Sequence, residues 1–128
     1  MSEDPRRRLG QLGERLARGH LAAQGYELLE ANFRTRLGEL DLVARQDDCL
    51  VFCEVKTRAA RGPPGPFGPL TAVGSRKRRQ VRLLARQWLA ERRDRIGAHP
   101  GELRFDAIGV LLGADGRLLA LEHVEAAF

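Results

Sequence analysis

The stretch GELDLVARQDDCLVFCEVKTR, residues 38–58, decides the fold predicted for this chain. It contains two apolar runs, residues 37–45 and 49–57, which are rich in valine, leucine and phenylalanine. The polar residues Gln46, Asp47 and Asp48 separate the runs and are typical of a turn. Together these features predict two strands that pair as an antiparallel hairpin. Because successive side chains on a strand point to opposite faces, Asp41, Glu54 and the charged neighbours two residues from each share one face.

The turn also predicts the register of this hairpin. A turn centred on residues 47–48 places Asp41 opposite Glu54, and it places Glu39 opposite Lys56. Side chains that face each other directly have Cβ atoms about 4.5–5.5 Å apart. Two carboxylates at that separation repel each other unless a cation lies between them. Mg²⁺ suits this position because it takes one or two carboxylates and keeps water and substrate phosphate as its other ligands.

Asp41, Glu54 and Lys56 therefore predict a metal-dependent site for a phosphodiester. The two acids would hold Mg²⁺ or Mn²⁺, while the ammonium group of Lys56 would orient water or neutralise charge on the phosphate. The alternative is a set of surface ion pairs, each worth roughly 0–1 kcal/mol. The apolar neighbours of these residues make the strands central, and charges on a central strand need a reason.

The rest of the chain predicts two helices and further strands around the hairpin. Residues 6–24 carry apolar side chains at helical spacing after the start signal Asp4-Pro5, and residues 75 to about 96 repeat that spacing with Ser75 as the expected N-cap. Residues 61–74 are dense in glycine and proline, which predicts a loop. The resulting order α-β-β-β-α-β-β predicts an α/β fold with a mixed central sheet flanked by helices. The remaining strands are expected at residues 26–31, 103–112 and 117–124.

Length and composition limit the class of protein. The chain has 128 residues, of which 43% are hydrophobic, and this suits one domain over residues 1–128 with a core of its own. Its uncharged runs fall well short of the roughly 20 residues that a membrane span requires. Residues 1–11 are polar and basic, unlike the start of a signal peptide. We therefore expect a cytoplasmic protein with no membrane partner.

Positive charge is concentrated in one segment. Residues 76–95 hold nine cations and two acids, whereas the net charge of the whole chain is +5, so the remainder is mildly acidic. This asymmetry predicts an anionic partner, with nucleic acid ahead of an anionic membrane surface. Contacts to the phosphate backbone would give affinity without sequence readout. The residues predicted to make them are Arg76, Lys77, Arg79, Arg82, Arg86 and Arg93.

The same residues carry a resemblance to a known family. Gly38–Leu42 and Val51–Arg58 resemble the hallmark of the YraN family of small bacterial proteins, which is similar to the PD-(D/E)XK nucleases with their restriction-endonuclease-like fold. The resemblance covers most of the chain. The other matching segments are Gly10-x-x-Gly13-Glu14-x-x-Ala17, Gly25-Tyr26, Asn32-Phe33-Arg34, Phe67-Gly68-Pro69 with Ala72-Val73 and Lys77, and Arg104-Phe105-Asp106.

This resemblance implies a nuclease site with Mg²⁺ or Mn²⁺ as cofactor. Asp41 would be the aspartate of the motif, Glu54 its second acid and Lys56 its lysine. Glu14 would be the acid that archaeal Holliday-junction resolvases carry on their first helix. Two residues are expected to support the site: Glu39, as an ion-pair partner of Lys56, and Arg58.

The function predicted from the sequence is a metal-dependent nuclease whose expected substrate is DNA rather than RNA, with branched or repair intermediates as candidate substrates. One alternative is a non-catalytic nucleic-acid-binding module on the same fold, with the basic helix but no metal affinity. Another is a scaffold whose arginine face meets an acidic protein. A homodimer is left open. Asp106 is assigned a structural pairing beside Arg104.

Overall fold

A mixed five-stranded sheet organises the fold, which we describe from a computed structural model covering residues 4–60, 74–92, 94 and 101–128. The strand order is β1-β2-β3-β4-β5, and all neighbours are antiparallel except β3 and β4, which are parallel. The predicted α/β class and element order are confirmed, and the arrangement is consistent with a restriction-endonuclease-like fold. The elements are α1 (Pro5–Ala23), β1 (Glu27–Thr35), β2 (Gly38–Gln46), β3 (Cys49–Ala59), α2 (Ser75–Glu91), β4 (Glu102–Leu112) and β5 (Leu118–Val124).

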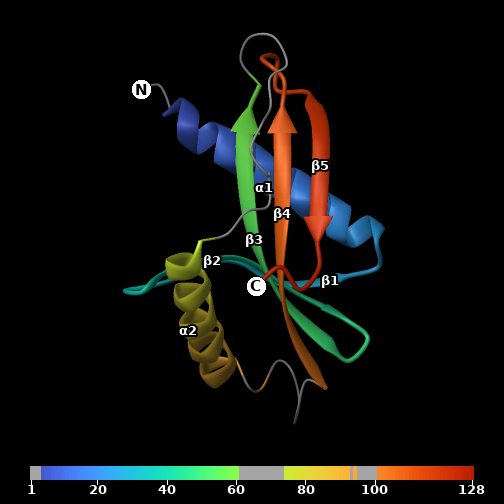
Figure 1. Ribbon diagram of the computed structural model, residues 1–128. Coiled ribbons are helices and arrows are strands. Elements are labelled where there is room, and N and C mark those ends of the chain that lie inside the picture. Colours follow the sequence, from blue (N-terminus) through green and yellow to red (C-terminus); the bar gives the residue numbers. More distant parts are fainter. Residues whose placement is uncertain (1–3, 61–73, 93, 95–100) are drawn as a thin grey trace.

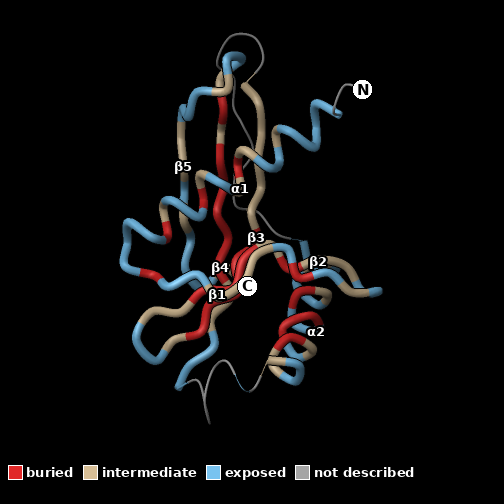
Figure 2. The backbone as a smooth tube through the Cα atoms, turned by 180° about the vertical axis from the view of Figure 1, so that it is seen from behind, coloured by how far each residue is buried: buried red, intermediate tan, exposed pale blue. Residues whose placement is uncertain are grey.

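The two helices cover opposite faces of the sheet (Figure 1). Ala17 and Leu21 of α1 pack into one core cluster with residues of β2, β3 and β4. Val81, Leu84 and Trp88 of α2 pack into a second cluster on the other face. Figure 2 shows buried backbone along β4 and on the sides of both helices that face the sheet. The core therefore has two layers, with the hairpin of β2 and β3 contributing to both.

Several element boundaries differ from those predicted. The first strand was expected to end at Ala31, but β1 continues to Thr35, because the chain passes through Asn32 with a positive φ of 58° and then resumes pairing. The N-cap of α2 is Gly74 and not Ser75, and no side chain caps this helix. Most of the predicted loop, residues 61–73, and part of the end predicted for the second helix, residues 93 and 95–96, lie outside the described residues.

The strands β1 and β2 turn over along their length. Leu42 packs in the cluster under α1, whereas Leu40 packs in the cluster under α2. On a regular strand, residues two positions apart would share a face. The change occurs at Asp41, and Asn32 lies opposite it in the register of β1 and β2. This turn-over leaves Asp41 between the two layers of the core.

Close contact with β3 sets the position of α1. Asp4 caps the helix by accepting a hydrogen bond from the backbone N–H of Arg6 at 3.0 Å, and Pro5 follows it, as the sequence predicted. Gly13 is buried against β3, and a Cβ atom added there would overlap the side chain of Thr57. A glycine is therefore required for this approach, which brings the next residue, Glu14, to the hairpin.

Candidate active site

The site lies where β2 and β3 separate. Their pairing follows the predicted register from Gln46 with Cys49 as far as Leu42 with Cys53. Beyond this point the backbone N–H of Val55 donates to the carboxylate Oδ2 of Asp41 at 2.8 Å. A side chain thus replaces the backbone acceptor that a continued ladder would have supplied. Meanwhile β3 stays paired with β4 along its whole length.

The separation also changes the partner found for Glu39. The extended register would have placed Glu39 opposite Lys56, but in the structure Glu39 pairs with Arg34 of β1. Its Oε2 lies 3.4 Å from Nε of Arg34. The predicted position of Glu39 opposite Lys56 is wrong because β2 leaves β3 before reaching that rung.

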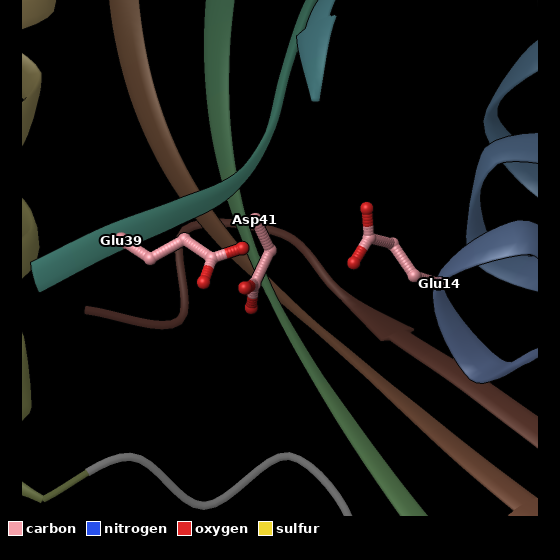
Figure 3. A group of neighbouring side chains, drawn as sticks. All are labelled: Glu14, Glu39 and Asp41. Atoms are coloured by element: carbon pink, nitrogen blue, oxygen red, sulfur yellow. The ribbon is translucent and has the colours of Figure 1, made fainter. Parts of the chain in front are cut away.

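Three carboxylates converge at this point (Figure 3). Glu39 and Asp41 project from β2, and Glu14 faces them from α1. One carboxylate oxygen from each lies within 4.8 Å of the others. They line a pocket of about 500 Å³ that is open to solvent on the α1 side of the sheet. Arginines border the acids, and those lining the pocket are Arg6, Arg7 and Arg34.

Asn32 holds Glu14 in the site, a role that sequence analysis missed. Its side-chain amide donates to Oε1 of Glu14 at 2.7 Å. The positive φ of Asn32 is tolerated better by asparagine than by most residues, because the short amide can satisfy local polar groups. Asn32 belongs to a segment that matched the family pattern, but nothing in the sequence pattern tied that segment to the first helix.

Glu54 lies next to Asp41 and is only 9% exposed. Its Oε1 forms an ion pair with Nζ of Lys77 on α2, at 3.1 Å. Its Oε2 is buried and has no hydrogen-bond partner among the described residues. Buried polar atoms in proteins are nearly always satisfied, so this oxygen calls for a proton shared with Asp41, which lowers the pKa of Glu54, or for a bound cation.

Burial is the largest cause that raises the pKa of Asp41, Glu54 and Glu14, and Asp41 itself lowers the pKa of Glu54. The pKa of Asp41 is raised to about 7, first by burial and then by the negative charge of Glu54, against the lowering effect of the Val55 hydrogen bond. Burial also raises the pKa of Glu54, although Lys77 opposes this. The pKa of Glu14 is raised by burial and by Asp41, while Asn32 lowers it. Asp41 therefore retains part of its proton near neutral pH unless a cation takes the place of that proton.

The two lysines, Lys56 and Lys77, lie on different elements, β3 and α2. Lys56 and Arg58 follow Glu54 on β3 at alternate positions, as the sequence places them, and their roles stay predictions. Lys77 was grouped with the arginines of the second helix, but its ammonium group points to Glu54. Lys77 thus joins α2 to the acid group.

The arginines predicted to bind nucleic acid lie on the outside of α2. Four of them are exposed, and the guanidinium of Arg82 lies 4.9 Å from the centre of the Phe105 ring. Arg93 falls outside the described residues. The buried face of the helix, by contrast, is apolar. The exposed arginines are Arg76, Arg79, Arg82 and Arg86.

Asp106 forms the predicted structural pair with Arg104. The carboxylate is fully buried and accepts two hydrogen bonds from the guanidinium at 2.8 Å. Nε2 of His123 lies 2.7 Å from the same carboxylate, and Nδ1 of His123 lies 3.1 Å from Nε2 of His20 on α1. The contact between His20 and His123 was not predicted from the sequence, because the two histidines are about a hundred residues apart.

Fold and site together define an α/β protein with an acid group at a strand separation, and comparison with known proteins places it further. Residues 13–110 match the model of the uncharacterised protein family UPF0102. The chain belongs to this family, which is the YraN family suggested by its motifs.

Its relatives match over most of their length. A UPF0102 protein of Parafrankia sp. (strain EAN1pec) is 46% identical over 122 residues, covering 94% of this chain and 96% of the relative. One from Streptomyces griseus is 48% identical, covering 84% and 86%. One from Alkaliphilus oremlandii is 41% identical, covering 95% and 98%. Within the described residues, no helix is both long and apolar enough to cross a membrane.

Proposed function

We propose that this protein is a metal-dependent nuclease that hydrolyses phosphodiester bonds in DNA, branched or repair intermediates included. The observation that carries this proposal is the meeting of Asp41 and Glu54 at the separation of β2 and β3, with Oε2 of Glu54 buried and unpartnered. Glu14 and Glu39 add two further carboxylates beside Asp41.

The donor set fits a hard divalent cation. Carboxylate oxygens are the ligands that Mg²⁺ and Mn²⁺ prefer, and both ions also keep waters that a substrate phosphate can replace. Asp41 and Glu54 would hold the ion, with Glu14 beside them. Bound there, it would acidify a water and neutralise charge on the phosphate. The raised pKa of Asp41 fits this role, since a cation would replace the proton that Asp41 partly retains.

The other residues of the site act on the substrate. Lys56, two residues after Glu54 on β3, would neutralise charge that develops on the phosphate oxygens. The exposed arginines of α2 would bind the flanking backbone, because phosphate contacts position a duplex without reading its sequence. Lys77 connects these two functions, since it belongs to the same helix and contacts Glu54.

Cleavage of branched and linear DNA in Mn²⁺ or Mg²⁺ tests the proposal. We expect wild-type protein to cut, and Asp41→Ala and Lys56→Ala to lose roughly a hundredfold or more of the activity. Glu122→Ala, which removes an exposed acid on β5, serves as the control and should cut normally. Cleavage that persists in Asp41→Ala would show that the activity comes from elsewhere.

The exposed arginines of α2 also favour a second candidate, a nucleic-acid-binding module without catalysis. Titration calorimetry with Mn²⁺ separates the two. A nuclease should bind Mn²⁺ in wild type and lose that binding in Asp41→Asn. A protein that binds DNA but takes up no Mn²⁺, with or without DNA present, would be the binding module.

A further inference from the structure

The hairpin of β1 and β2 extends past the acid group as an arm that crosses close to α2 (Figure 1). Its tip is a two-residue turn, Arg36-Leu37, between Thr35 and Gly38. The side chain of Leu37 is 48% exposed at this tip. The side chain of Arg34 beside it is 68% exposed, and Arg36 is exposed as well. The arm therefore presents one apolar side chain next to two arginines, of which Arg34 also forms an exposed ion pair with Glu39.

Contacts to α2 hold the arm in place from tip to base. At the tip, the side-chain amide of Gln80 donates to the backbone carbonyl of Leu37. Gly38 has a φ of 132° and lies so close to Gln80 that a Cβ atom would collide with its amide. Such close packing restrains the direction in which the tip points.

At the base of the arm, Glu30 receives hydrogen bonds from two residues of the α2 region. Nε1 of Trp88 donates to its Oε1 at 3.0 Å, and Nε of Arg92 donates to the same oxygen at 2.9 Å. The guanidinium of Arg92 also lies 5.3 Å from the centre of the Phe33 ring. Because contacts to α2 restrain both its tip and its base, the arm is held rigidly enough to deform a molecule that binds to the tip.

A groove lies between the tip and the C-terminal half of α2. It has a volume of about 510 Å³ and is lined by Arg34, Thr35, Arg36, Leu37, Gln87 and Glu91. Proteins that bend DNA insert an apolar side chain between base steps in the minor groove, with arginines at the flanking positions. A narrow turn suits the minor groove of DNA, which is about 6 Å wide in B-DNA and has a negative potential that attracts arginine.

We infer that the tip of the arm is a wedge that enters the minor groove of duplex DNA, where Leu37 unstacks a base step and Arg34 and Arg36 contact the adjacent backbone. The inference deepens the proposed function, on which it rests, by naming how duplex DNA is held and deformed. Leu37 and Asp41 are four residues apart on an extended chain, about 13 Å at 3.3 Å per residue. The tip and the acid group can therefore contact one short duplex at the same time.

Binding and bending of DNA without divalent metal test the wedge independently of cleavage. A duplex of about 30 base pairs with a fluorophore at each end reports bending by energy transfer, and anisotropy reports affinity. We expect Leu37→Ala to weaken binding by roughly fivefold to tenfold, because the variant no longer buries part of a leucine side chain between bases. We also expect it to abolish the bend. The matched control is Leu119→Ala on β5, whose leucine is 47% exposed, and it should behave as wild type.

A second duplex, nicked at its centre, sharpens the test. A nick removes most of the stiffness that the wedge must overcome, so Leu37→Ala should lose less affinity for nicked than for intact DNA. Wild-type binding without bending, or equal losses in Leu37→Ala and Leu119→Ala, would overturn the inference. Bending without cleavage in Mn²⁺ would contradict only the nuclease, whereas cleavage by a wild-type protein that does not bend the duplex would contradict only the wedge.

Discussion

Asp41 lies where the pairing of β2 with β3 ends. Its carboxylate accepts a hydrogen bond from the backbone N–H of Val55 and lies beside the carboxylate of Glu54. Desolvation and the charge of Glu54 both favour the protonated form, and they outweigh the hydrogen bond from Val55. Without metal, Asp41 thus keeps a proton at a pH where an aspartate in water has lost it. This difference between folded and unfolded chain can be measured.

The stability of the metal-free protein should fall as pH rises from about 4 to 7. The unfolded chain loses the Asp41 proton near pH 4, whereas the folded chain keeps it to about 7, so the stabilisation present at low pH is lost as pH rises through the folded pKa. We expect Asp41→Asn to remove a decline on the order of 2–4 kcal/mol. Urea unfolding in chelator across this pH range measures it, and an equally steep decline in Asp41→Asn would contradict the assignment.

Metal affinity should change with pH in the opposite direction. A carboxylate must release its proton before it can ligate a cation, so Mn²⁺ binding should strengthen as pH rises through about 7. Calorimetry in buffers of different ionisation enthalpy should detect proton release on binding. In Glu54→Gln we expect binding to weaken by roughly tenfold to a hundredfold. Binding that does not vary between pH 6 and 8 would argue against Asp41 as a ligand.

At the scale of elements, the fit between α1 and β3 depends on one missing side chain. Gly13→Ala would place a methyl group against Thr57, and we expect a loss of about 1–3 kcal/mol in stability together with displacement of Glu14. Gly10→Ala and Gly19→Ala lie on the same helix with nothing near the added Cβ, so they should stabilise by about 0.5–1 kcal/mol. Thermal unfolding of the three variants compares them directly, and equal effects would show that the contact does not limit packing.

The sequence was sufficient to predict the order of helices and strands along the chain and most of the central hairpin. The spacing of apolar side chains indicates the elements, and a polar turn defines the hairpin. It predicted that Asp41 and Glu54 lie close together, although the paired register ends one rung before them, at Leu42 and Cys53. It could not predict that β2 turns over at Asp41, since that change depends on the backbone of Asn32 on another strand. The partners Lys77 and Asn32 were out of reach for the same reason, because both contacts join segments that only the tertiary fold brings together.

Across the whole molecule, a buried charge network ties the C-terminal end to the first helix. Asp106 joins Arg104 on its own strand to His123 on β5, and His123 contacts His20 on α1. Removing the carboxylate would leave the mostly buried guanidinium of Arg104 with only the Tyr26 hydroxyl and a longer ion pair to the exposed Glu125. We expect Asp106→Ala to cost about 3–5 kcal/mol in unfolding free energy while Mn²⁺ affinity of the folded protein is kept. A loss below 1 kcal/mol would contradict a structural role.

Electrostatic attraction to DNA should depend on the outer face of α2. Arg79 and Arg86 are exposed and lie away from the acid group, so Arg79→Gln and Arg86→Gln should leave Mn²⁺ binding unchanged. Each should reduce the slope of log affinity against log salt by about 0.9, the value expected for loss of one phosphate contact. Anisotropy titrations from 50 to 300 mM salt measure this, and an unchanged slope in the double variant would exclude the helix as the contact surface.

Where β2 separates from β3, the residue that best serves the proposed metal site at position 41 is not the one that gives the most stable fold. A valine at residue 41 could no longer accept from Val55, and the two backbones would then gain by continuing their pairing. Such a chain would lose a buried, partly protonated acid and extend its sheet. A selection for heat resistance alone should therefore enrich apolar β-branched residues at 41 and return robust but inert proteins.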